Sequence, residues 1–408
     1  MNKKRIVSSC LLLSLIFTSG CWDSTEVNEL AIELAWGIDK GQDGDVMISA
    51  QVIVPSKISG GQSGGKPGGG KEKPFFVVTS SGMNTLDAVQ QMQTKLSRRV
   101  FRGHRRVIII GESLARHGIK DVLDTYTRDP NLKLRTDLFV VKGSTAREFL
   151  NISYPLETIP GLGALGEYDQ IGTLMEMGFI NFLVSASSKG SSPTVPVLVS
   201  GLNSDLSQEG EDQDQSEKVD AEGFRIAGSG IFDQDLKLVG FLDVTEARAL
   251  RWITGKLQKL TITTQIPDQT GNASMEVINP GSKIQPVIRG NQIKIFVTLT
   301  GKGDIRENNT RLDLTQTGNV NLLQDTFNKH IEESVLRTIT KVQKKYGTDV
   351  FGFGDDIHNK IPSQWKSLKN KWDQEFSKAE IFVKADLKVR RVGVTGPSVH
   401  LMDDEIKR

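Results

Sequence analysis

The sequence predicts a multi-domain α+β protein with mixed and antiparallel sheets, packed helices and a lipid-anchored soluble ectodomain. In the first half, short apolar strands alternate with amphipathic helices, which is typical of layered α and β structure. In the second half, several strands precede one long helix. A chain of 408 residues is too long for one hydrophobic core, so two or three domains are expected.

An export signal opens the chain. Lys3, Lys4 and Arg5 precede an apolar run over 6–17, and small residues at 18–20 stand directly before Cys21, which is the layout of a lipoprotein signal with its lipid acceptor. We therefore predict that residues 1–20 are removed and that Cys21 carries S-diacylglycerol and an N-acyl chain, although Thr18 stands where Leu is commonest. Two alternatives are cleavage without a lipid and a retained helix, but the apolar run is well short of the roughly 20 residues that span a membrane.

Charge and cysteine content exclude several classes of function. The chain has 51 basic and 49 acidic residues, and the signal removes three of the basic ones, so the mature protein has no basic excess and no nucleic-acid partner is expected. The chain has two cysteines, Cys10 in the signal and Cys21 at the lipid site. No thiol is left for a disulfide, a cysteine metal site or a nucleophile.

The first predicted domain is an N-terminal α/β domain over 21–203, with a flexible Gly-rich loop at 59–73. Asn84 or Thr85 can cap a helix whose apolar positions are Leu86, Val89, Met92 and Leu96. The predicted strands cover 31–38, 46–54, 75–79, 106–110 and 134–141, and the other predicted helices cover 113–126, 144–150 and 169–183.

An acidic linker at 204–220 separates this domain from a small middle α/β domain at 221–270 and a C-terminal α+β domain at 271–408. The middle domain is predicted to hold a hairpin over 223–241, a helix at 245–253 and a strand at 259–266. The C-terminal domain is predicted to hold strands at 273–278, 284–289, 293–299 and 381–389 and a helix at about 318–346. One apolar row follows that helix: Leu323, Phe327, Ile331, Val335, Ile339 and Val342.

Two glycine motifs match nucleotide-binding patterns in letters but not in context. Gly161-Leu-Gly163-Ala-Leu-Gly166 follows no clear strand and has no acidic residue about 20 positions later, so a turn into a helix is the better interpretation. Gly60 to Lys66 has P-loop spacing, but Pro67 stands where Ser or Thr would hold magnesium. No cofactor is predicted.

Metal and catalytic motifs are also missing from the sequence. The five histidines, at 104, 117, 330, 358 and 400, have no paired-ligand spacing. Asp355-Asp356-Ile-His358 is better explained as a polar loop before a helix than as a cation site. No Ser/His/Asp or paired-carboxylate motif has supporting context, so no catalytic residue is predicted.

One basic cluster surrounds His104, formed by Arg98, Arg99, Arg102, Arg105 and Arg106. A solvated face is the simplest explanation. The functional alternative is contact with anionic headgroups or with an acidic partner, and a lipid on Cys21 would hold the domain close enough to a membrane for such contact.

The chain resembles the Ger(x)C spore-germination lipoproteins, the C subunits of nutrient germinant receptors. The matching segments are Cys21-Trp-Asp, Asn28-Glu-Leu, Trp36-Gly-Ile-Asp39, Gly103-His104, Ile108-Ile-Ile-Gly-Glu112, Ala115–Ile119, Arg128-Asp129, Phe232–Gly240, Leu242-Asp243, Arg251-Trp252, Gly255-Lys256, Asp349–Lys366, Trp372, Phe376 and Arg390–Gly393. These segments span nearly the whole mature chain.

The resemblance implies three small α/β domains, no enzymatic activity and a complex with two integral-membrane receptor subunits, one A-type and one B-type. It also implies an outward-facing position on the spore inner membrane or the cell membrane, and a role in receptor assembly and in coupling nutrient sensing to germination. The alternatives are a solute-binding lipoprotein that delivers a small ligand to a transporter and, less favoured, an exported hydrolase. The unlike halves of the chain argue against the two similar lobes that are usual in solute-binding proteins.

Overall fold

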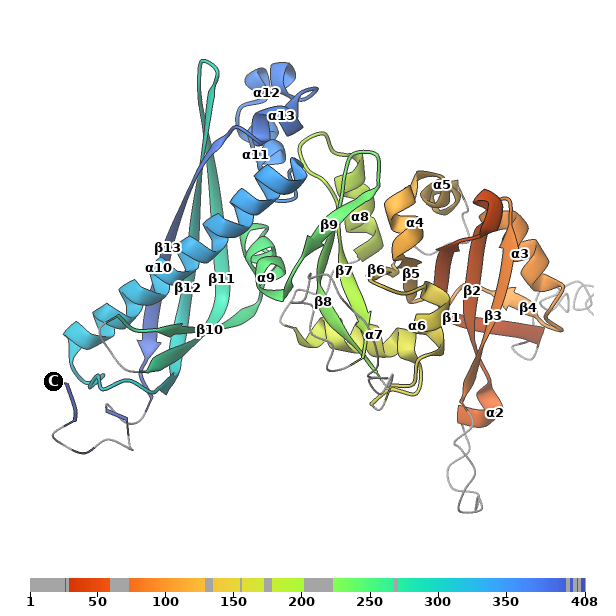
Figure 1. The fold of residues 1–408 in the computed structure, drawn as a ribbon, viewed down its shortest axis with the longest axis horizontal. Helices are drawn as coiled ribbons and strands as arrows, with labels where there is room; N and C mark the ends of the chain where they lie inside the picture. Colours follow the sequence, from red (N-terminus) through yellow and green to blue (C-terminus); the bar gives the residue numbers. More distant parts are fainter. Residues whose placement is uncertain are drawn as a thin grey trace, which may run out of the picture.

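The computed structural model describes residues 26, 29–58, 73–128, 135–154, 156–171, 178–201, 223–267, 271–393, 397–398, 402 and 405–407. Two bodies lie side by side along the long axis, and each is built on its own sheet (Figure 1). Cys21, nearly all of the Gly-rich loop and the acidic linker fall outside the described residues. Among the described helices, none is both long enough and apolar enough to cross a membrane.

The first body contains a nine-stranded sheet with the order β3-β2-β1-β5-β6-β7-β8-β9, and β4 pairs with β1 off this path. Parallel pairing joins β1, β5, β6 and β7, whereas antiparallel pairs flank them. The strands are β1 (Leu30–Lys40), β2 (Val46–Ile53), β3 (Phe75–Gly82), β4 (Arg99–Phe101), β5 (Val107–Gly111), β6 (Asp137–Val141), β7 (Thr194–Ser200), β8 (Phe224–Phe232) and β9 (Leu238–Leu242).

Helices cover both faces of this sheet, because its central strands are apolar on both sides. In β5, Ile108 and Ile110 belong to one core, and Val107 and Ile109 to the other. The first core takes apolar residues from α3 (Thr85–Gln93), α4 (Glu112–His117), α5 (Lys120–Arg128) and α8 (Gly178–Ser187). The second core takes them from α6 (Ala146–Asn151) and α7 (Pro160–Gln170). The short elements η2 (Gln42–Gly44) and α2 (Pro55–Ile58) lie in connections.

The second body contains a four-stranded sheet with the order β10-β11-β12-β13. Its strands are β10 (Lys259–Gln265), β11 (Asn272–Arg289), β12 (Gln292–Asn308) and β13 (Glu380–Arg391). Its helices are α9 (Val244–Ile253), α10 (Thr317–Lys341), a π-helical turn η3 (Val342–Tyr346), α11 (Phe353–Lys360), α12 (Pro362–Leu368) and α13 (Trp372–Phe376). β12 and β13 are parallel, because the segment with α10 to α13 carries the chain back across the sheet.

The long-helix prediction is confirmed. All six residues of its apolar row are buried, from Leu323 at the start to Val342 at the end. α10 crosses the sheet as one rod, and its row forms a single core with the inner faces of the strands (Figure 1). The alternation in β13 is confirmed as well, because Ala385 and Leu387 are buried while their neighbours are exposed.

The structure corrects the expected middle domain at 221–270. Its hairpin, β8 and β9, extends the first sheet through pairing of β8 with β7, and its helix and last strand, α9 and β10, join the second body. The described residues therefore form two sheets where the sequence suggested an N-terminal, a middle and a C-terminal domain. A two-stranded hairpin cannot bury enough apolar surface alone, so it completes a larger sheet.

Three element boundaries and the exposure of one side chain differ from the prediction. The helix expected at 113–126 is divided at Gly118, whose φ of 123° suits glycine. The helix expected at 169–183 corresponds to the end of α7 and to α8. Two expected strands, 273–278 and 284–289, are one strand, β11, with an irregularity between Ile278 and Gly281. Leu86, expected on the buried face of α3, is 58% exposed.

Side chains of α10 cap the free edge of β13. The backbone N–H groups of Ala385, Leu387 and Val389 donate to side-chain oxygens of Glu332, Asn328 and Gln324 at 2.9, 2.8 and 3.2 Å. These acceptors are spaced by four residues along the helix, so they follow the strand edge. An uncovered strand edge would be a template for pairing with another chain.

We expect the triple variant Gln324→Ala/Asn328→Ala/Glu332→Ala to lose about 3 kcal/mol of unfolding free energy, since each lost hydrogen bond costs about 1 kcal/mol. The exposed edge should also cause concentration-dependent association, measured by sedimentation. The matched triple Asp325→Ala/Lys329→Ala/Glu333→Ala changes exposed positions one residue further along and should do neither. Equal behaviour of the two triples would show that the caps do not protect the edge.

Candidate functional site

The predicted basic cluster is divided by the structure. Arg98, Arg99 and Arg106 are exposed and Arg102 is half-buried, between the end of α3 and the start of β5. Arg105 is the exception, with 4% exposure. Arg105 therefore cannot contact a membrane or partner, and the prediction for this residue is wrong.

Arg105 forms a buried ion pair with Glu33 of β1. Its Nε donates to Glu33 Oε1, and its guanidinium lies 4.2 Å from the centre of the Trp36 ring. Burial raises the pKa of the Glu33 carboxyl, and the charge and hydrogen bond of Arg105 oppose that rise. Burial also raises the pKa of Tyr126, whose hydroxyl is 3.4 Å from Arg105 Nη1, to about 12. The group holds β1, α5 and the segment before β5 together.

We expect Arg105→Ala to lower the unfolding free energy by about 3–5 kcal/mol, because Glu33 would be left buried without its cation. Arg106→Ala, at the neighbouring exposed position, should change it by less than about 0.5 kcal/mol. Denaturant unfolding of both variants is the measurement. A loss below about 1 kcal/mol in Arg105→Ala would mean that Glu33 is easily neutralised or solvated.

A polar junction joins the two bodies through the segment after α8 and the segment at 348–355, which includes the first residues of α11. Ser192 Oγ lies 2.5 Å from Thr348 Oγ1, and the Ser192 N–H donates to the Asp349 carbonyl at 2.6 Å. Ser188 donates to Asp355 Oδ1 at 2.5 Å. The backbones touch at Gly190, where a Cβ would lie 2.6 Å from the Gly354 carbonyl carbon. Both segments must therefore keep their conformations for the bodies to meet.

Asp349 holds the second of these segments in shape. Its fully buried carboxyl accepts hydrogen bonds from the N–H groups of Phe351, Gly352 and Gly354 at 2.9–3.0 Å and from Trp372 Nε1 at 3.0 Å. Burial raises the pKa of Asp349 to about 7, against the opposing effect of these donors. The junction thus depends on a carboxyl that titrates near neutral pH.

The pH dependence of this carboxyl has a definite sign. Because its pKa is higher in the folded than in the unfolded protein, the folded state binds more protons between about pH 4 and 7, and the contribution of Asp349 to stability falls as the pH rises. Asp349→Asn removes this titration. We expect the unfolding free energy of the wild type, relative to Asp349→Asn, to fall between pH 5 and pH 8. A constant or rising difference would show that the four donors keep the carboxyl ionised throughout.

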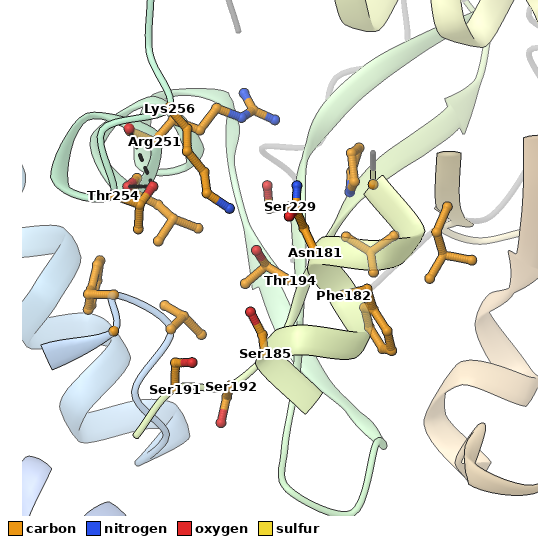
Figure 2. Close-up of a pocket in the computed structure, with 18 of the residues that line it drawn as sticks. Asn181, Phe182, Ser185, Ser191, Ser192, Thr194, Ser229, Arg251, Thr254 and Lys256 are labelled. Carbon is orange, nitrogen blue, oxygen red and sulfur yellow. Dashed lines mark hydrogen bonds between the residues drawn. The ribbon is translucent and has the colours of Figure 1, made fainter. Parts of the chain in front are cut away.

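A cavity of about 220 Å³ lies beside the junction (Figure 2). Asn181, Phe182 and Ser185 reach it from α8, and Arg251, Thr254 and Lys256 reach it from the end of α9 and the turn that follows. The polar lining also includes the hydroxyl groups of Tyr168, Ser191, Ser192, Thr194 and Ser229 and the carboxyl groups of Asp137 and Asp355. Hydroxyls, an amide, two carboxyl groups and two cations can hold ordered water or a small polar molecule, and the described lining residues include no histidine or cysteine.

The glycine motif at 161–166 and the Asp-Asp-Ile-His segment at 355–358 both have structural roles. Gly161 and Gly163 lie in α7 and let the helix approach the sheet, because a Cβ at Gly161 would be 2.4 Å from the Ala35 Cβ. This agrees with the interpretation as a turn into a helix. Asp355, Asp356 and His358 lie in α11 and not in a loop, and Asp356 pairs with Lys360. Among the described residues, no group of three metal-ligating side chains occurs.

Comparison with known proteins connects this architecture to one family. The family described as "Spore germination protein N-terminal domain" matches residues 23–200, and "Spore germination B3/ GerAC like, C-terminal" matches residues 227–393. The solved structure "Crystal Structure of the GerBC protein" has a TM-score of 0.54 at 21% identity, over 88% of this chain and 98% of that one. It supports the fold.

Curated relatives match over nearly their full length. "Spore germination protein KC" of Bacillus subtilis (strain 168) is 28% identical over 99% of this chain and 100% of its own. "Spore germination protein B3" of the same organism is 26% identical over 95% of this chain and 98% of its own. The two matched ranges together cover nearly all of both bodies and, apart from Cys21 and Trp22, the residues that carry the resemblance. The chain belongs to the Ger(x)C family of spore germination proteins.

Proposed function

We propose that this protein is the lipid-anchored, non-enzymatic C subunit of a nutrient germinant receptor. In this role it assembles with two integral-membrane subunits, A-type and B-type, and couples nutrient sensing to germination. The observation that carries the proposal is the match to spore germination proteins along the whole chain. A member of this family with an anchor at Cys21 would face outward from the spore inner membrane or the cell membrane.

The position of the basic cluster supports the anchored arrangement. β1 begins at Leu30, nine residues after Cys21, so the tether spans at most about 30 Å. Parallel pairing of β1 with β4 places Leu30 opposite Arg99. Arg98 and Arg99 therefore lie where the chain arrives from its anchor. Each such charge near an anionic surface adds about 1 kcal/mol of attraction.

The junction supports the coupling role. The polar contacts between the segments at 188–192 and 348–355 are backed by an apolar contact, because Ile231 and Leu242 of the first sheet share a core with α9 and α10. α9 packs on β8 and on β11, so it contacts both sheets. A movement of one body would therefore be transmitted to the other body through α9.

We expect in-situ cross-linking of the tagged protein in spore inner membranes to recover two polytopic receptor subunits. Recovery should fall in Cys21→Ala, which removes the lipid, and to a smaller extent in Arg98→Glu/Arg99→Glu, which removes attraction to anionic lipid. Mass spectrometry of the cross-linked products is the measurement.

Lys344→Glu, an exposed charge reversal on the second body, serves as the control and should leave recovery unchanged. Recovery of a transporter permease, or of no membrane partner, would contradict the proposal. The solute-binding alternative would then become the better explanation.

A further inference from the structure

A groove of about 430 Å³ lies where β9 of the first body meets the end of α10 and the turn η3 of the second. Cations line it from both bodies: Arg116 and Lys142 from the first, and Lys341 and Lys345 from the second. Its apolar lining comes from β7, β8 and β9, through Val197, Ala227, Val239 and Phe241. The groove therefore has a positive rim and an aromatic and aliphatic floor.

Contact between the bodies builds the groove. Tyr346 of η3 donates its hydroxyl to the Phe241 carbonyl at 3.1 Å. The Tyr346 ring lies against Gly240, where an added Cβ would be 2.1 Å from Tyr346 Cε1. Only glycine permits this approach, so the glycine in β9 fixes how η3 sits over the sheet. An occupant of the groove would touch both bodies at once.

The positive charge of the groove is only partly neutralised. Arg116 pairs with Glu112 at 2.7 Å and Lys341 pairs with Glu246 at 2.8 Å. Asp243 is the one carboxylate among the described lining residues, and it caps the start of α9 by accepting from the Glu246 N–H. These acidic groups already have structural roles.

Lys142 and Lys345 lack an acidic partner among the described residues, and each lies close to an aromatic ring. Lys142 Nζ lies 4.9 Å from the centre of the Phe241 ring, and Arg116 lies 5.4 Å from the same centre. Lys345 Nζ lies 5.6 Å from the centre of the Tyr346 ring. Ring faces attract cations by about 0.5–1 kcal/mol at exposed sites, which is weaker than a charge-assisted bond to a carboxylate. The two ammonium groups can therefore take carboxylates from an incoming ligand.

The shape of the groove selects among anionic ligands. A flat bilayer surface cannot reach a concave floor, and a single small anion would leave the apolar floor uncovered. An extended acidic peptide satisfies both parts, because its carboxylates can meet the rim while its backbone and small side chains cover the floor. We propose that this groove binds an acidic peptide segment of a partner protein. Its charge is a property of this chain alone, so such binding does not depend on the receptor assignment.

The test uses the mature full-length chain in detergent and a fluorescein-labelled peptide of alternating Glu and Ala, with binding followed by fluorescence anisotropy. We expect Lys142→Glu/Lys345→Glu to weaken binding by about tenfold or more, since like charges would face each other, and added salt to weaken wild-type binding. The same peptide with Lys in place of Glu should not bind. Unchanged thermal unfolding of the double variant would show that it folds.

Lys344→Glu is the matched control, because this exposed residue lies in the same turn η3 but does not line the groove. It should keep the wild-type affinity within about twofold, since exposed charges away from a site contribute little. An equal loss of peptide affinity in this control would show that binding depends only on the net charge of the protein, and it would overturn the proposal. So would displacement of the peptide by equimolar inorganic phosphate, or loss of phosphatidylglycerol-vesicle binding in the double variant without loss of peptide binding.

Discussion

The arrangement of the two bodies depends on the buried carboxyl of Asp349. A charge without partners would be strongly disfavoured at this depth, and the three backbone N–H groups and the Trp372 indole offset that cost. The same hydrogen bonds hold the segment from 348 to 355 in one conformation. That conformation presents Thr348, the Asp349 carbonyl and Asp355 to the first body, where Ser192 and Ser188 meet them. The acceptors of the junction would be displaced if the carboxyl lost its donors.

The junction contains apolar and polar contacts, and the two kinds affect the arrangement of the bodies differently. The apolar packing of α9 against both sheets resists separation, because parting the sheets would expose Ile231, Leu242 and the buried face of the helix. The hydroxyl contacts are directional, and water can replace them at small cost. Such a junction keeps the bodies together and still permits a small change of angle. The cavity in Figure 2 and the cationic groove both take residues from each body, so either would change shape with that angle.

Local patterns in the sequence predicted the elements whose structure depends on neighbours along the chain. The apolar row of α10 and the alternation in β13 are periodic, and burial follows the period. Periodicity could not predict which sheet the hairpin β8–β9 joins, because its pairing with β7 brings together residues that the segment 202–222 separates in the sequence. Periodicity identifies which face of a strand is apolar but not which sheet buries it.

The site residues likewise divide into those that local sequence patterns predict and those that depend on contacts between distant segments. Arg105 has the same charge as the four arginines near it in the sequence, so all five were expected to form one surface cluster. The informative residue was Glu33, a carboxylate between the apolar residues Ala31 and Trp36, since a buried acid must be compensated by a cation or by hydrogen-bond donors. Asp349, followed by glycines at 352 and 354, could likewise have indicated a loop held by a carboxyl that accepts backbone N–H groups.

The geometry also relates the proposed anchor to the junction. β1 begins near the tether and is separated from β9 by five strand spacings, about 24 Å across the sheet. The second body lies beyond β9, so it stands away from the anchored strand along the long axis (Figure 1). In the proposed receptor, the arginines near β4 would hold one end of the first sheet at the bilayer, and the groove would lie at the other end. A partner bound in that groove would act on the angle between the bodies, because Lys142 and Lys345 belong to different bodies and an occupant that pairs with both must fix the distance between them.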